Sequence, residues 1–171
     1  MSWRRWLSID ERFGRPASVP AIVGVGNRNR GDDAVGCVVV DLLAGFGEAA
    51  LFDAGVAPEN AIQSLVRLGP RHILFVDACM LGTQAGEFRI VERAELDSLA
   101  GSFTSTHALP LTMTIAMLEM ELGPVSISLL AVQPACLDFG GSLSQPVTAA
   151  LPRVVESCRR WALLSGRGVT Q

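Results

Sequence analysis

The chain has 171 residues, 49% of them hydrophobic, which is enough to bury the core of one domain without disulfides or a structural metal. Its formal net charge of −3 leaves no surplus of basic side chains to neutralise phosphates, so no nucleic-acid partner is expected. No apolar run reaches the length of a membrane span, and the four cysteines form no C-x-x-C pair, so we expect a cytoplasmic protein without a membrane partner.

Residues 1–19 precede the first clear strand pattern. The pair Arg4-Arg5 is followed by charged residues rather than by an apolar stretch, so we do not expect an export signal. We predict an irregular extension over residues 1–19, a single α/β domain over 20–166, and a short tail over 167–171.

The first predicted strand, Ala21–Val25, is short and apolar, and it runs into a glycine-rich turn. Asp32 and Asp33 follow this turn and open an apolar helix. A strand, a turn and a helix in this order bring polar groups to the crevice beyond the strand ends of an open α/β sheet. The segment does not fit a dinucleotide-binding loop, because Asn29 stands where G-x-G-x-x-G requires its third glycine.

Four more strands are predicted further along the chain. The continuous apolar run His72–Asp77 is typical of a central strand in a parallel sheet. Phe88–Val91 follows glycine-containing turns and is predicted as a short edge strand. The runs Ala50–Phe52 and Val125–Val132 complete the set.

Helical patterns fill the segments between these strands. One helix begins at Pro58 and another runs from Pro146 to Leu164. The residues expected to face the sheet are Ile62, Leu65, Val66 and Leu68 in the former and Val147, Leu151, Val154, Val155 and Leu163 in the latter. A third helix has Pro110 in its first turn and ends at Gly123-Pro124. Its apolar stripe of Leu111, Ile115 and Leu118 is joined by a methionine stripe, Met113, Met117 and Met120, which we interpret as core filler.

This alternation of strands and helices predicts the fold class. We expect an α/β protein with three layers, in which a mostly parallel twisted sheet of about five strands carries helices on both faces.

Three residues that are distant in the sequence are predicted to meet at one edge of this sheet. Asp33 follows the first strand, Asp77 ends the third, and His107 precedes a helix. The carboxyl ends of parallel strands and the starts of the following helices lie along the same edge. Two carboxylates and an imidazole suit nickel, zinc or non-haem iron, with positions left for water or a ligand.

Structural roles for the same residues remain open at this point. Asp32 and Asp33 could cap a helix, with Asp32 as the expected cap, and Asp77 could hydrogen-bond a loop. His107 could be a structural histidine in a polar turn, whereas His72 is expected at the surface. The chain has no G-x-S-x-G elbow and no H-E-x-x-H motif, which argues against a serine hydrolase and a common zinc peptidase.

Ten short motifs occur in order from about residue 20 to the final helix. They are Gly24-Val-Gly-Asn27, Gly31-Asp-Asp33 with Gly36, Asp53-Ala-Gly55, Ala57-Pro-Glu-Asn60, Val76-Asp77-Ala78, Gly86-Glu-Phe-Arg-Ile90, Thr106-His107, Pro110-Leu111, Val132-Gln-Pro134 and Gln145-Pro146. With these motifs the chain resembles the nickel–iron hydrogenase maturation endopeptidases, most of all the type that serves the hydrogenase of formate hydrogenlyase.

The resemblance implies a selective endopeptidase with the hydrogenase maturation protease-like fold. Family members act on the hydrogenase large-subunit precursor after nickel insertion, and they remove a short C-terminal extension just past the C-x-x-C-x-x-His/Arg motif. The nickel is regarded as the substrate's own, so the resemblance implies no tightly bound cofactor, although cadmium or zinc could occupy the site. We expect the chain to be a monomer.

The resemblance also assigns residues. Asp33, where many members have glutamate, Asp77 and His107 fall on the metal-contacting positions and are expected to be catalytic. The residues expected to bind the substrate are Gly26, Asn27, Asp53, Gly55 and Asn60. The chain departs from the family pattern at Cys79-Met80-Leu81, where polar residues are usual, and residues 1–19 have no counterpart.

Two other functional classes are weighed against this one. A nickel-binding maturation chaperone or sensor on the same fold would bind nickel or precursor and leave the extension intact. A general metallopeptidase would carry its own metal and cut unrelated peptides. A loosely held site of two carboxylates and one histidine favours the maturation enzyme.

Overall fold

A five-stranded sheet forms the centre of the computed structural model, which describes residues 9–10, 15–16, 18–99 and 108–166. The strand order is β4-β3-β5-β7-β6. The strands are β3 (Ala21–Val25), β4 (Ala50–Gly55), β5 (His72–Ala78), β6 (Phe88–Glu92) and β7 (Ser126–Val132). β5 is central and pairs in parallel with β3 and β7, and β6 pairs antiparallel with β7 at the edge. The predicted mostly parallel sheet is confirmed.

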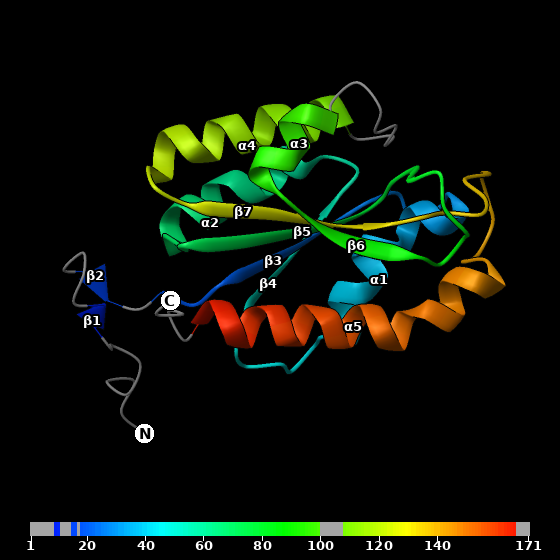
Figure 1. Ribbon diagram of the computed structural model, residues 1–171, viewed down its shortest axis with the longest axis horizontal. Helices are drawn as coiled ribbons and strands as arrows, with labels where there is room; N and C mark the ends of the chain where they lie inside the picture. Colours follow the sequence, from blue (N-terminus) through cyan, green and yellow to red (C-terminus); the bar gives the residue numbers. More distant parts are fainter. Residues whose placement is uncertain (1–8, 11–14, 17, 100–107, 167–171) are drawn as a thin grey trace.

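Helices cover both faces of the sheet, as Figure 1 shows. The 3-10 helix η2 (Gly31–Ala34) with α1 (Val35–Leu42) and α5 (Gln145–Gly166) lie on one face. The other face carries η3 (Pro58–Ala61), α2 (Ile62–Leu68), α3 (Arg93–Leu99) and α4 (Ala108–Leu122). The sequence analysis did not predict α3, whose residues are largely polar and carry no strong helical stripe.

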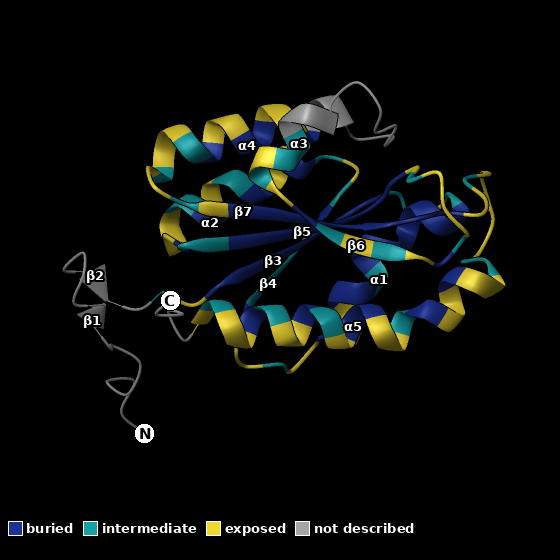
Figure 2. Cartoon of the chain, in the orientation of Figure 1, coloured by how far each residue is buried: buried dark blue, intermediate teal, exposed yellow. Residues whose placement is uncertain are grey.

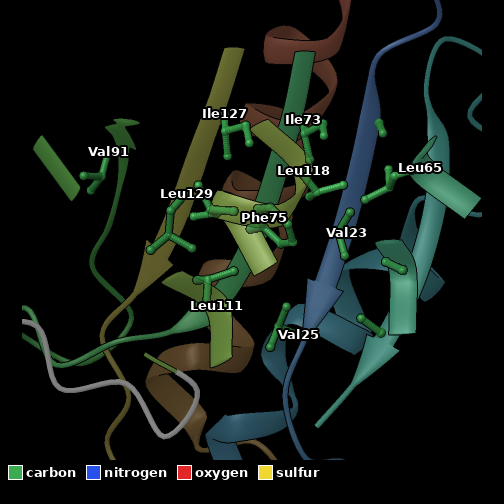
Figure 3. Close-up of a cluster of buried hydrophobic side chains, with 14 of the residues drawn as sticks. Val23, Val25, Leu65, Ile73, Phe75, Val91, Leu111, Leu118, Ile127 and Leu129 are labelled. Atoms are coloured by element: carbon green, nitrogen blue, oxygen red, sulfur yellow. The ribbon is translucent and has the colours of Figure 1, made fainter. Parts of the chain in front are cut away.

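Two hydrophobic cores form because successive strand residues point to opposite faces. Val23 and Phe75 pack toward α2 and α4, in the cluster drawn in Figure 3. Ile22 and Leu74 point the other way and pack toward α1 and α5. The strands are therefore buried on both sides (Figure 2), which explains why β5 and β7 read as continuous apolar runs.

Two leucines expected to face the core are exposed instead. Leu68 is the last residue of α2, and Gly69 after it is left-handed, so Leu68 lies beyond the helical turn that contacts the sheet. In the last turns of α5, Cys158 and Ala162 take the buried positions and Leu163 turns outward.

The methionine stripe on α4 is also exposed, so its interpretation as core filler is wrong. Met113, Met117 and Met120 are 60%, 49% and 85% exposed. The other stripe, with Leu111 as its first member, fills the core as predicted. One face of α4 therefore suffices to cover the sheet.

The described part of the N-terminal region contains a short ladder. β1 (Ile9–Asp10) pairs antiparallel with β2 (Arg15–Pro16), which differs from a wholly irregular extension. The division at residues 19 and 166 stays a prediction. Among the described residues, no helix has both the length and the apolar character required to cross a bilayer.

Helix α1 contacts the sheet through backbone atoms. A Cβ on Gly36 would lie 2.1 Å from the carbonyl oxygen of Val76 and 2.3 Å from that of Val25. A Cβ on Gly24 would lie 2.3 Å from the carbonyl oxygen of Gly36. These separations are far below van der Waals contact, so only glycine allows α1 to approach β3 and β5 this closely.

The carboxylate of Asp32 fastens the start of η2 to the loop between β7 and α5. Its Oδ2 accepts hydrogen bonds from the backbone N–H groups of Ala135 at 2.7 Å and Cys136 at 3.1 Å, and its Oδ1 accepts one from Ser144 at 2.6 Å. These donors offset the cost of burying the charge. The expected capping role is wrong, because the side chain makes no cap bond to its own helix.

Replacing Gly36 with alanine tests the backbone contact. We expect Gly36→Ala to lower the free energy of unfolding by about 3 kcal/mol, because backbone atoms of two strands block the new methyl group. Urea denaturation measures the loss. Gly47→Ala is the control, since nothing lies within 4 Å of a Cβ there and we expect a change within about 0.5 kcal/mol. Equal losses in the two variants would contradict the packing argument.

A second denaturation experiment tests the hydrogen bonds between Asp32 and the loop between β7 and α5. Asp32→Asn keeps the shape of the side chain but places an NH₂ group against backbone donors and removes the charge. We expect a loss of about 2–3 kcal/mol in the free energy of unfolding. Asp138→Asn, an exposed carboxylate in the same loop, is expected to stay within about 0.5 kcal/mol of the parent protein. An unaltered stability of Asp32→Asn would show that the three amides do not need the carboxylate.

Candidate active site

The candidate site lies at the edge of the sheet where the parallel strands β3, β4, β5 and β7 end. The nominated residues that the structure describes stand at or near the strand ends, in the loops that follow them, or at the start of the next helix. Helix η2, which carries Asp33, contacts β5, which carries Asp77. The two elements are therefore in contact at this edge, whereas the meeting of the three nominated side chains stays a prediction.

Asp33 is buried at the end of the turn that follows β3. Its Oδ2 accepts a hydrogen bond from the backbone N–H of Asn27 at 3.0 Å. The side-chain Oδ1 of Asn27 in turn accepts from the N–H of Asn29 at 2.9 Å, which shapes the turn. Gly26 permits this geometry, because it has φ of +143° and a Cβ on it would lie 1.8 Å from the carbonyl oxygen of Asp33.

Asp77 is the second buried carboxylate of the edge. It is the penultimate residue of β5, and its Oδ1 accepts a hydrogen bond from the N–H of Ala78 at 2.9 Å. Ligands of open α/β sheets bind in the crevice beyond the carboxyl ends of the strands. A buried carboxylate at the end of the central strand is therefore a candidate for function.

The third nominated residue, His107, lies outside the described residues. Helix α4 begins at the next residue, Ala108. The helix returns to the opposite edge, where the N–H of Ser126 donates to the carbonyl of Arg71 at 2.8 Å. A 15-residue helix is roughly as long as a seven-residue strand, so α4 starts near the edge that carries Asp33 and Asp77.

The nominated substrate-binding residues come together at the ends of β3 and β4. The N–H of Gly26 donates to the carbonyl of Gly55 at 2.8 Å. The N–H of Gly55 donates to Oδ1 of Asp53 at 3.0 Å, and Nδ2 of Asn60 donates to the carbonyl of Ala54 at 3.4 Å. These contacts join the two loops into one surface.

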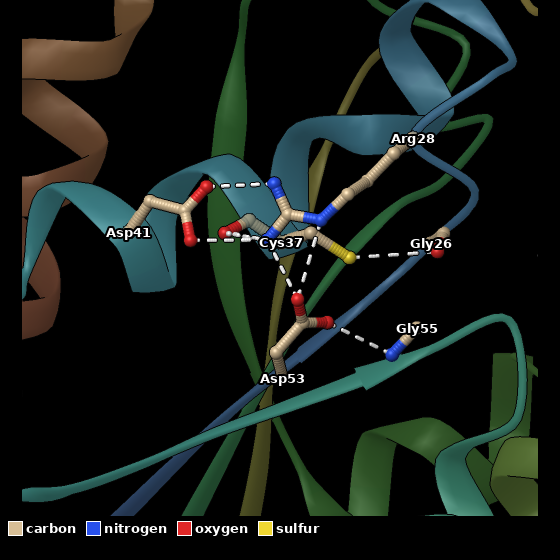
Figure 4. A network of polar contacts seen from close by, with 6 residues as sticks. All are labelled: Gly26, Arg28, Cys37, Asp41, Asp53 and Gly55. Carbon is tan, nitrogen blue, oxygen red and sulfur yellow. Dashed lines mark hydrogen bonds and ion pairs between the residues drawn. The ribbon is translucent and has the colours of Figure 1, made fainter.

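An arginine that the sequence analysis missed lies beside this surface. Arg28 contacts Asp41 and Asp53 through its guanidinium group, as Figure 4 shows. Burial alone would raise the pKa of Asp53, but hydrogen bonds led by that from Arg28 outweigh it and lower the pKa. The partners of Arg28 are 13 and 25 residues away, so no local pattern in the sequence indicates the pairing.

Gln133 is another residue whose role only the structure reveals. Its buried side-chain Oε1 accepts hydrogen bonds from the N–H groups of Leu81 at 2.6 Å and Gly82 at 3.1 Å. Its Nε2 donates to the carbonyl of Pro134 at 3.0 Å. Gln133 thus holds the loop after β5 against the end of β7, and the motif Val132-Gln-Pro134 was its only sequence signal.

Two of the cysteines are unsuited to nucleophilic catalysis. Desolvation, with the neighbouring Asp53 carboxylate, raises the pKa of Cys37 to about 12, and burial raises the pKa of Cys158 to about 12. Both thiols are neutral at physiological pH, whereas the thiolate is the nucleophilic form. Cys37 instead donates from Sγ to the carbonyl of Gly26 at 3.4 Å.

Comparison with known proteins identifies the family of this fold and site. The model of the HycI family, described as hydrogenase maturation protease, matches residues 38–161. This range includes Asp77 and His107 and begins after Asp33.

Individual relatives agree with the family match. The hydrogenase 3 maturation protease of Escherichia coli K12 is 34% identical over 140 residues, which cover 80% of this chain and 86% of the relative. The solution structure of the endopeptidase HycI from Escherichia coli superposes with a TM-score of 0.71 at 29% identity and covers 84% of this chain and 90% of its own. HycI from Thermococcus kodakarensis KOD1 gives a TM-score of 0.72 at 28% identity, with coverages of 85% and 93%.

A family model that spans most of the chain, a relative above 30% identity and a shared fold agree with one another. They also confirm the resemblance drawn from the ordered motifs. The chain is an endopeptidase that belongs to the hydrogenase maturation protease family.

Proposed function

We propose that this endopeptidase removes the C-terminal extension of a nickel-loaded nickel–iron hydrogenase large-subunit precursor. The observation that carries the proposal is the pair of buried carboxylates, Asp33 and Asp77, on contacting elements at one sheet edge in a chain of this family. His107 directly precedes α4 and completes the proposed set of catalytic and metal-contacting residues.

The donor chemistry suits a metal that arrives with the substrate. Carboxylate oxygens are hard ligands and imidazole is a borderline one, so Asp33, Asp77 and His107 would contact nickel without forming a cage of soft thiolates. Cysteines of the precursor would hold the nickel more firmly than this set does. The enzyme would therefore recognise the loaded precursor and need no tightly bound cofactor, although cadmium or zinc could occupy the same contacts.

Fixed hydrogen bonds would orient the two carboxylates for cleavage. The N–H of Asn27 holds Asp33, and the N–H of Ala78 holds Asp77. When the precursor's nickel lies between these side chains, the scissile bond is placed beside them, and a water held by a carboxylate attacks the carbonyl carbon. The carboxylate accepts a proton from that water during the attack and passes it to the nitrogen of the leaving amine as the C–N bond breaks, which regenerates the carboxylate.

The loops after β3 and β4 would bind the substrate tail. Gly26, Asn27, Asp53, Gly55 and Asn60 form a joined surface next to Asp33. A Cβ on Gly55 would meet nothing within 4 Å, so the missing side chain there leaves room for a peptide to approach the backbone closely. The protein would act as a monomer in the cytoplasm.

Membership of a protease family does not favour a chaperone or a sensor. A general metallopeptidase is less consistent with the site, because the nominated ligands lack the tetrahedral histidine and cysteine sets typical of resident zinc. Assay of an unrelated unfolded protein, together with metal analysis of the purified chain, separates this class from the proposed one.

Mass spectrometry of a large-subunit precursor tests the nickel requirement. We expect loss of a C-terminal peptide when the nickel-loaded precursor is incubated with the enzyme, and an intact precursor when nickel has been omitted. Equal cleavage of both forms would show that nickel is not recognised. An intact precursor in both forms would contradict the proteolytic proposal for that partner.

Substitution of the nominated residues tests the catalytic assignment. We expect Asp33→Asn, Asp77→Asn and His107→Ala each to slow cleavage by about 10²–10⁴-fold while circular dichroism shows a retained fold. Asp138→Asn serves as the matched control and should keep the parental rate, because this carboxylate is exposed and is not among the nominated residues. Normal cleavage by all three site variants would overturn the assignment.

A further inference from the structure

We propose that Arg28 is a positioning residue, which holds the substrate-binding loop after β4 in register with the turn after β3. This inference rests on the proposed function, because it assigns Arg28 an effect on precursor binding. It goes beyond the nominated residues, since Arg28 itself need not touch the substrate.

The guanidinium group of Arg28 bridges two carboxylates from different elements. Nη1 donates to Oδ2 of Asp41 at 2.6 Å and Nη2 donates to Oδ1 of Asp41 at 3.0 Å, so this contact is bidentate. Nη2 also donates to Oδ2 of Asp53 at 2.6 Å, and Nε donates to the same oxygen at 3.3 Å. A third contact runs from Nη2 to the carbonyl of Cys37 at 3.4 Å.

These contacts connect a rigid helix with the end of a strand. Asp41 and Cys37 belong to α1, which is packed directly against the sheet, whereas Asp53 belongs to β4. The planar fork of arginine can satisfy both carboxylates at once, which a lysine ammonium cannot do with the same geometry. The contacts with α1 therefore fix the guanidinium group of Arg28, and this group in turn restrains the side chain of Asp53.

Asp53 connects Arg28 to backbone groups at the ends of β3 and β4. Its second oxygen, Oδ1, accepts from the N–H of Gly55, and the carbonyl of Gly55 accepts from the N–H of Gly26. Gly55 has φ of +60°, so the strand ends in a left-handed turn whose conformation depends on local hydrogen bonds. Hydrogen bonds thus link Arg28 through Asp53 and Gly55 to Gly26, which lies two residues before Arg28 in the chain. Figure 4 shows the contacts of Arg28 with Asp53 and of Asp53 with Gly55.

The ion pairs of Arg28 are partly exposed to solvent, which indicates that they order the nearby loop rather than stabilise the whole fold. The side chains of Arg28, Asp41 and Asp53 are 45%, 57% and 37% exposed. Ion pairs with this exposure contribute little to the stability of the fold and are weakened by salt. Loss of Arg28 should therefore loosen the loop without unfolding the protein.

Steady-state cleavage of nickel-loaded precursor tests the effect on binding. We expect Arg28→Ala to raise KM roughly 3- to 10-fold, as expected for lost charge-assisted hydrogen bonds, and to leave kcat within about twofold. Arg28→Lys should fail to restore KM. Arg89→Ala is the matched control, because Arg89 is also 45% exposed and pairs with Glu95 at the opposite edge of the sheet. An unchanged KM in Arg28→Ala would overturn the proposal.

Amide hydrogen exchange tests the positioning directly and needs no activity. We expect faster exchange at Gly26 and Gly55 in Arg28→Ala and in Asp53→Asn, with parental exchange in Arg89→Ala and an unaltered melting temperature in each variant. Parental exchange in Arg28→Ala would overturn the proposal. If the parent enzyme itself leaves the nickel-loaded precursor intact, the proposed function fails, and the exchange result still decides whether Arg28 positions the loop.

Discussion

The structure depends on the backbone contact between α1 and the central strands. Gly24 and Gly36 remove the two side chains that would separate the helix from β3 and β5. With α1 this close, the turn before it is drawn onto the edge of the sheet, and Gly26 lies against the carbonyl of Asp33. The glycines therefore fix the place of the catalytic candidate more directly than any polar contact does, because close packing leaves the backbone no alternative position.

The adjacent residues Asp32 and Asp33 accept hydrogen bonds from different loops. Asp32 binds backbone amides of the β7–α5 loop, whereas Asp33 is held by the turn after β3. Successive residues of a 3-10 helix point about 120° apart, which is how neighbours in the sequence reach different surroundings. Backbone donors stabilise buried carboxylates without adding a competing charge. The edge that carries the candidate site can thus hold two adjacent carboxylates while their hydrogen bonds keep its loops ordered.

Much of the fold was predictable because its signals are local. The apolar run of β5 and the helix limits at Pro110 and Gly123 needed only neighbouring residues, and parallel topology then placed Asp33 and Asp77 at one edge. The α3 helix was missed because its largely polar sequence carries no strong apolar stripe. The roles of Asp32 and Arg28 depend on partners far along the chain, and the exposure of the α4 methionines depends on what α4 packs against. Such features follow from tertiary structure and have no local pattern.

The sequence separation between Asp32 and its hydrogen-bond donors affects the order in which parts of the chain can fold during synthesis. Its amide partners lie 103 to 112 residues further along the chain. A growing polypeptide therefore exposes β3, the glycine turn and α1 long before the amides that neutralise this carboxylate have been made. Contacts between residues so far apart form late, since the intervening chain must first be closed into a loop. The edge that carries the candidate site is consequently incomplete until Ser144 has been made, so shorter nascent chains lack the finished arrangement of Asp32 and its amide donors.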